Sequence, residues 1–183
     1  LIKKEFLEIY RESDLNKLTD NLIASTEDWK SLNAKMLITL FYCTGMRLNE
    51  LICLKESQID FIKSQVKVLG KGNKERIIPL SAETIQLLKE YRQFKKEEYS
   101  DADDYFFITE KGNKLYDKCV YNIVNSYLAL VTTIEKKSPH ILRHTFATDF
   151  LRKTNNVFAL KEVLGHASIE QAMVYAKIAG VTV

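Results

Sequence analysis

The segment "IDFIKSQVKVLGKGNKERIIPL", residues 59–80, is the most informative about the fold class, because the spacing of apolar residues changes within it. Val66 and Val68 alternate with polar neighbours, residues 70–73 have the glycines and asparagine of a tight turn, and apolar residues resume at Ile77. An alternating pattern on both sides of a turn predicts a β-hairpin, here with a lysine-bearing turn.

Helical patterns surround this hairpin. Residues 31–43 carry the broad apolar face of a buried helix, and Gly45 separates it from a short helix in "MRLNELICL". Ser81 is a suitable N-cap for a helix that runs to about Tyr99. Further helices are expected at 2–12, 14–25, 117–133, 138–153, 156–164 and 168–178, with Ser138-Pro139 and Gly165 as helix-end signals, and a short strand is expected at 105–109. The expected fold class is therefore mainly α with a small antiparallel β-sheet (α+β).

Length and composition suit one compact domain. The chain has 183 residues, of which 46% are hydrophobic and only two are prolines. The opening "LIKKEFLEIY" mixes charges with apolar residues, so neither a signal peptide nor a membrane span is expected there. Cys43, Cys53 and Cys119 lack the spacing of a disulfide framework or zinc ribbon, and we expect reduced core thiols in a cytoplasmic protein.

Charge is unevenly distributed along the chain. The net charge is only +3, but residues 63–76 hold five basic side chains and one acidic one, whereas "EEYSDADD" at 97–104 is acidic. A basic ribbon of this kind suits a nucleic-acid partner. The alternative is a solvated hairpin edge that lysines protect from pairing with other strands.

Two histidines and an arginine lie close together in "SPHILRHTFATDF", residues 138–150. His140 and His144 have the i, i+4 spacing of zinc ligands, with His166 as a possible third. However, Ile141 stands where a zinc protease of this pattern needs its glutamate, and Arg143 would repel a dication. No metal site is therefore expected, and His140 with Arg143 fits an anion clamp instead.

Other motifs strengthen the anion clamp. "TGMRLNEL" at 44–51 places Arg47 after a glycine turn with Glu50 one helical turn later. Lys71 lies at the expected hairpin tip, and "LGHASIEQAMVY" at 164–175 adds His166 and Tyr175. Two arginines, a lysine, two histidines and a tyrosine suit phosphoryl transfer through a covalent tyrosine.

The ordered set of motifs resembles the catalytic domain of the tyrosine recombinases. The matching stretches are "TGMRLNEL", "GKGNKERIIPL", "SPHILRHTFAT" and "LGH" followed by a tyrosine nine residues later, and they are most similar to the Xer-like and transposon-integrase branch. The likeness extends over essentially the whole chain and implies the catalytic-domain fold of DNA breaking-rejoining enzymes.

The resemblance implies a role for each matched residue. Arg47 and Arg143 would hold the non-bridging oxygens of the scissile phosphate. Tyr175 would attack phosphorus, giving a 3′-phosphotyrosyl bond and a free 5′-hydroxyl. Because that bond conserves the energy of the broken phosphodiester, neither ATP nor a metal nor another cofactor is implied.

The proton-transfer roles are implied in the same way. Lys71 would protonate the leaving 5′-oxygen, and His140 would help to move the tyrosine proton. His166 would donate a hydrogen bond to the phosphate, and Glu50 would hold a histidine or the lysine in place.

Three further residues stand in the matched motifs. Lys74 and Arg76 compete with Lys71 for the acid role, but the family pattern favours Lys71, so Lys74 and Arg76 are expected to contact DNA backbone phosphates. His144 is given no catalytic role and is expected to pack or to make a structural hydrogen bond.

The resemblance also implies partners and limits. Residues 1–183 would be a single catalytic domain, without the N-terminal core-binding domain of the family, and the chain ends eight residues after Tyr175. The partners would be double-stranded DNA, further recombinase subunits forming a tetramer when the protein is full length, and accessory DNA-bending or directionality proteins, in the cytoplasm and without a membrane. Two alternatives stay open: a type IB topoisomerase and a DNA-binding accessory module without chemistry.

Overall fold

A central helix organises the fold. The computed structural model describes residues 28–101, 104–130, 138–165 and 169–182, and within them α3 (Trp29–Thr44) contacts α5, α6 and α7. It begins at Asp28, whose carboxylate accepts the Ser31 amide at 2.7 Å, and ends at Gly45. The helices predicted at 2–12 and 14–25 lie outside the described residues.

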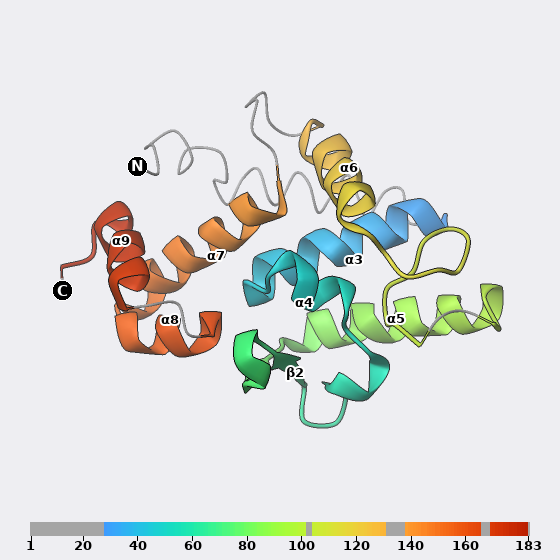
Figure 1. Cartoon of the computed structure of the whole chain (residues 1–183), viewed down its shortest axis with the longest axis horizontal. Helices are drawn as coiled ribbons and strands as arrows, with labels where there is room; N and C mark the ends of the chain where they lie inside the picture. The colour runs from blue at the N-terminus through green and yellow to red at the C-terminus, as the bar shows by residue number, and fades with distance from the viewer. Residues whose placement is uncertain (1–27, 102–103, 131–137, 166–168, 183) are drawn as a thin grey trace.

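The remaining elements follow in chain order, as Figure 1 shows. They are α4 (Leu48–Ile52), the short 3-10 helix η1 (Glu56–Gln58), β1 (Ile59–Asp60), β2 (Gln65–Leu69), the 3-10 turn η2 (Lys71–Asn73), β3 (Glu75–Pro79), α5 (Ala82–Glu98), α6 (Asp117–Leu128), α7 (Pro139–Thr154), α8 (Val157–Leu164) and α9 (Ile169–Ala179). The predicted class, mainly α with a small antiparallel sheet, is confirmed.

The predicted hairpin forms and gains a third strand. The sheet order is β1-β2-β3, with antiparallel pairing of Val66 to Ile78 and of Val68 to Arg76. Val66 and Val68 are buried, as their alternation predicts. Gly72 has φ +75°, a conformation that glycine adopts without strain, and this allows the turn that carries Lys71.

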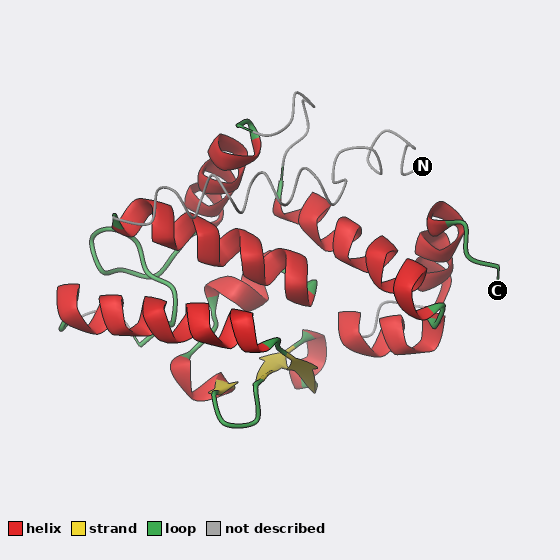
Figure 2. Cartoon of the chain, turned by 180° about the vertical axis from the view of Figure 1, so that it is seen from behind, coloured by secondary structure: helices red, strands yellow, loops and turns green. Residues whose placement is uncertain are grey.

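Two hydrophobic clusters divide the interior. The larger one surrounds α3 and includes the aromatic contacts of Trp29 with Tyr91, Phe94 and Tyr99. The smaller one joins α7, α8 and α9, which lie together in both views (Figures 1 and 2), and it includes Tyr175. The segment around α3 and α4 thus packs in the larger cluster and Tyr175 in the smaller one. The two clusters meet where α3 contacts α7.

Some expectations differ from the structure. Residues 105–109 form two isolated bridges, Lys55 with Tyr105 and Ile108 with Lys114, instead of a strand, because this segment has no continuous partner strand. Helix α6 ends at Leu128, earlier than predicted. The cysteines are free thiols, but Cys43 is exposed instead of buried in the core. None of the described helices is long and apolar enough to cross a membrane.

Candidate active site

The turn after α3 sets the direction of Arg47. Thr44 is fully buried, and its hydroxyl accepts the Met46 amide at 3.2 Å. Gly45 reverses the chain with φ +64° and ψ +20°, and its amide donates to the carbonyl of Phe41. The sequence "TGMR" therefore stops one helix and begins the next with Arg47 at the N-cap of α4.

Glu50 fastens Arg47 at this position. Its carboxylate accepts the Arg47 amide at 2.9 Å and the Arg47 Nη1 at 3.1 Å, so the start of α4 is capped from one helical turn away. The Glu50 side chain is 6% exposed, whereas the Arg47 side chain is 38% exposed. Arg47 is therefore held at its backbone amide and at one guanidinium nitrogen, while its side chain remains partly accessible.

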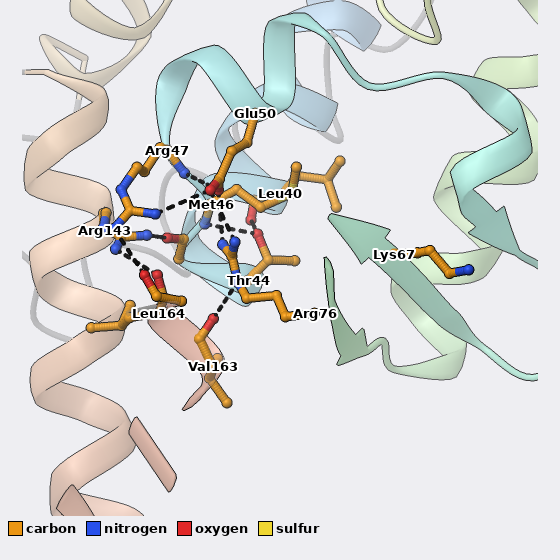
Figure 3. A network of polar contacts seen from close by, with 12 residues as sticks. Leu40, Thr44, Met46, Arg47, Glu50, Lys67, Arg76, Arg143, Val163 and Leu164 are labelled. Atoms are coloured by element: carbon orange, nitrogen blue, oxygen red, sulfur yellow. Dashed lines mark hydrogen bonds and ion pairs between the residues drawn. The ribbon is translucent and has the colours of Figure 1, made fainter. Parts of the chain in front are cut away.

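Three arginines from three elements converge at the end of α8, as Figure 3 shows. They donate to three consecutive carbonyls, which the last turn of a helix leaves without helical partners. The bonds are Arg76 Nε to Val163 at 2.8 Å, Arg143 Nη2 to Leu164 at 3.0 Å and Arg47 Nη2 to Gly165 at 3.1 Å. Arg143 also donates through Nη1 to the carbonyl of Gly45. The arrangement concentrates positive charge around the single carboxylate of Glu50.

The ionisation of the cluster follows from its burial. Arg143 is 8% exposed, and burial, followed by the nearby charge of Arg47, lowers its pKa to about 10. Burial acts to raise the pKa of Glu50, but the hydrogen bonds from the Arg76 side chain and the Arg47 amide outweigh it, so the pKa lies below its ordinary value. Both groups are charged at neutral pH, and the cluster carries a net positive charge.

Tyr175 lies against α7 with its hydroxyl hydrogen-bonded to His144 Nδ1. The tyrosine is 8% exposed, and burial raises its pKa, while Arg143 and Arg47 pull it down. Burial, then His140 and Arg143, lower the pKa of His144, which therefore favours the neutral imidazole. The phenol is thus protonated, sheltered and within the electrostatic reach of both arginines.

The other predicted site residues lie around this cluster. Lys71 and Lys74 are exposed on the hairpin turn, and His140 is exposed in the first turn of α7. His166 lies outside the described residues. Three of the five guanidinium N–H groups of Arg76 donate to protein acceptors, and its side chain is only 10% exposed, so little of it is accessible to a DNA phosphate. The catalytic and DNA-contact roles stay predictions.

Two contacts were not anticipated in this form. Among the described residues Glu50 binds two arginines, Arg47 and Arg76, and its expected contact with a histidine or the lysine stays a prediction. His144 makes the structural hydrogen bond expected of it, but the partner is Tyr175 itself. Within the described ranges, no three His, Cys, Asp or Glu side chains gather in a manner that could hold a metal ion.

The chain matches the model of the phage integrase family over residues 9–180. It is 32% identical over 165 residues to the tyrosine recombinase XerC of Chlorobaculum parvum, covering 87% of this chain and 49% of that protein. It is 30% identical over 177 residues to the XerC of Staphylococcus aureus, covering 96% and 59%. The chain thus spans about half the length of the curated relatives it matches.

Solved structures give a consistent result. The XerH site-specific recombinase bound to palindromic difH substrate, in a post-cleavage complex, superposes with a TM-score of 0.81 at 29% identity, covering 93% of this chain and 49% of that chain. The XerA recombinase gives 0.78 at 25% identity, covering 91% and 57%. The catalytic domain of bacteriophage HP1 integrase shares the fold, with a TM-score of 0.63 at 23% identity and coverage of 92% and 86%. The chain belongs to the phage integrase family and is similar, in sequence and in fold, to the Xer-like tyrosine recombinases within it.

Proposed function

We propose that this chain carries the catalytic chemistry of a site-specific DNA recombinase. In the proposed reaction a DNA strand is cut and rejoined through a 3′-phosphotyrosyl bond, in the service of integrating or excising a mobile element. The observation that carries the proposal is the convergence of Arg47, Arg143 and Tyr175. Arg47 and Arg143 donate to adjacent carbonyls, and both act electrostatically on the Tyr175 phenol.

The arginines would stabilise the charge that develops on the phosphate. A phosphodiester presents two non-bridging oxygens, and guanidinium groups recognise such oxygens with paired, directional hydrogen bonds. In a site from which water is largely excluded, donors fixed in advance stabilise the transition state strongly. Arg47 and Arg143 are fixed in this sense, by Glu50 and by the carbonyls of 164 and 165.

The bond changes would follow in one displacement. The Tyr175 oxygen bonds to phosphorus while the bond from phosphorus to the 5′-oxygen breaks. Lys71 supplies the proton that the departing 5′-oxygen takes up, and His140 helps to remove the phenol proton, with His166 as a further hydrogen-bond donor to the phosphate. Rejoining is the reverse of these steps.

The position of Tyr175 adds a requirement. Its hydroxyl is bonded to His144 and its side chain is buried, so the tyrosine must leave this contact before it can reach a phosphate on a DNA duplex. Burial raises the pKa of the phenol further above neutral pH, so the nucleophile rests protonated and needs a base to remove its proton. The proposed reaction therefore includes a rearrangement of α9 that precedes attack.

The proposal includes the partners expected of such an enzyme. The substrate would be double-stranded DNA in the cytoplasm, and the full-length protein would act as a tetramer with accessory DNA-bending or directionality proteins. The similarity to proteins named tyrosine recombinases favours recombination over the topoisomerase and over a binding module without chemistry.

The test is formation of a covalent adduct. The purified chain is incubated in EDTA with nicked duplexes that lose the 5′-hydroxyl strand after cleavage, drawn from a panel of candidate element ends. Denaturing gels then report protein joined to a 3′ end. Tyr175→Phe is compared with Tyr116→Phe, whose side chain is 59% exposed on the surface and serves as the matched control.

We expect an adduct with the wild type and with Tyr116→Phe, and none with Tyr175→Phe. An adduct that persists in Tyr175→Phe would refute the assignment of the nucleophile. The same assay is run with the chain alone and with the chain joined to the N-terminal part of a relative. If both bind the duplexes and neither forms an adduct, the catalytic proposal is refuted.

A further inference from the structure

Arg76 differs from the other basic residues of the hairpin. The side chains of Lys67, Lys71 and Lys74 are exposed, whereas that of Arg76 is 10% exposed and turns toward α4 and α8. Its Nη1 and Nη2 donate to the two carboxylate oxygens of Glu50 at 2.9 and 2.8 Å. A paired bond of this kind fixes orientation as well as distance, which a lysine cannot reproduce.

Glu50 extends this bond to Arg47. The same carboxylate that accepts Arg76 also accepts the amide and the Nη1 of Arg47. Four hydrogen bonds therefore meet on one buried carboxylate, and they join β3 to the N-cap of α4. In Figure 3 the side chains of Arg76, Glu50 and Arg47 form a continuous chain.

The guanidinium of Arg76 also lies against the base of the Lys71 turn. The Gly70 amide donates to the Lys74 carbonyl at 2.9 Å and closes this turn. A methyl group added at Gly70 would lie 3.5 Å from Arg76 Nη1, and one added at Gly165 would lie 2.9 Å from the same atom. Arg76 therefore fills the space between the residue before Lys71 and the end of α8.

We propose that Arg76 is a positioning residue that holds the Lys71 turn in register with Arg47. The inference rests on the proposed function, in which Arg47 binds the scissile phosphate and Lys71 protonates its 5′-oxygen. Both groups must reach one phosphate, yet they stand on different elements. The Arg76–Glu50–Arg47 chain is a direct connection between those elements. This role replaces the phosphate contact that the sequence predicts for Arg76.

The magnitude follows from the sensitivity of catalysis to distance. A displacement of about 1 Å in a catalytic group can slow a reaction about 100-fold. Arg76→Lys keeps the positive charge but loses the paired bond, and so it isolates geometry from charge. We expect it to slow cleavage of a normal DNA strand about 10- to 100-fold.

A substrate with sulfur in place of the bridging 5′-oxygen shows whether a variant is slow because Lys71 no longer protonates the leaving group. A thiol has a pKa of about 8.5, so sulfur leaves as a thiolate and needs no acid. The nicked duplexes that give a Tyr175-dependent adduct are prepared with oxygen or with sulfur at this position. Adduct formation is timed for wild type, Lys71→Ala, Arg76→Lys and the exposed hairpin control Lys67→Gln, at saturating DNA.

We expect Lys71→Ala and Arg76→Lys to be slow with oxygen and to recover at least about ten-fold with sulfur, while Lys67→Gln resembles the wild type with both. If Arg76→Lys slows adduct formation equally on the two substrates while Lys71→Ala recovers with sulfur, the positioning role of Arg76 is refuted and the acid role of Lys71 stands. A failure of Lys71→Ala to recover would overturn the acid role of Lys71 and the inference with it.

The competing phosphate contact has its own signature. If Arg76 held a DNA phosphate, Arg76→Lys, which keeps the charge, would leave the salt dependence of binding nearly unchanged and would cleave at the normal rate once saturated, and this result would refute the inference. Urea unfolding followed by Trp29 fluorescence checks that each variant is folded. Arg76→Gln, whose amide can still donate, replaces Arg76→Lys if the latter does not fold.

Discussion

Gly45 offers a test of how tightly the turn before Arg47 is built. An alanine there would keep the φ of +64° that side-chain-bearing residues rarely adopt. Its methyl group would lie 2.4 Å from Cδ1 and 2.8 Å from Cε1 of Phe146, and 3.2 Å from Cδ2 of Leu164. Carbon atoms normally approach to about 3.5–4.0 Å, so the ring of Phe146 must move.

The expected loss has two parts. The left-handed conformation costs an alanine about 1–2 kcal/mol. Displacing a packed ring adds about 1–3 kcal/mol, as overpacking of interiors does. Gly45→Ala should therefore lower the free energy of unfolding by about 2–5 kcal/mol. The Phe146 ring also packs against Phe150, with 5.9 Å between centroids, which restricts its escape.

Gly72→Ala is the matched control. Gly72 has φ +75°, but an added methyl group would meet nothing within 4 Å, so this variant bears the conformational strain without the clash. Trp29 is the only tryptophan of the chain and is buried, so its fluorescence reports urea unfolding. We expect the midpoint for Gly45→Ala to lie about 1 M urea below that for Gly72→Ala. Equal midpoints would refute the argument that Phe146 and Leu164 close this turn.

Three more outcomes follow from buried polar groups. Because burial lowers the pKa of His144 below 6.5, the unfolded chain binds more protons, and the wild type should lose stability relative to His144→Gln as the pH falls below 6.5 in urea titrations. The lowered pKa of Glu50 predicts the same behaviour below pH 4.5, absent in Glu50→Gln. Tyr91→Phe leaves the oxygen of Asn33 without its 2.9 Å donor and should cost about 1–3 kcal/mol, measured by thermal unfolding; an unchanged midpoint would show that the bond is dispensable.

Local patterns were sufficient for most of the fold. Gly45 and Gly165, both with positive φ, end α3 and α8 as their positions in the apolar pattern predict. The alternation of Val66 and Val68 predicts strand β2 and the face it buries. Residues 105–109 were predicted less well, because a short apolar run does not determine whether a neighbouring strand is available to pair with it. That availability depends on packing between distant segments.

The role of Arg76 shows where such reasoning stops. In an antiparallel pair, directly opposed residues share a face, and Arg76 opposes Val68, which is buried. The alternation that buries Ile78 also directs Arg76 inward, so the sequence contains a signal that this arginine needs an internal anion and is poorly placed to meet DNA. The signal does not identify the anion. Glu50 lies 26 residues away, and only the packing of α4 against the hairpin and α8 brings it to Arg76. A buried charge thus predicts that a partner exists, while the fold determines which one, and here that partner is the carboxylate that also holds Arg47.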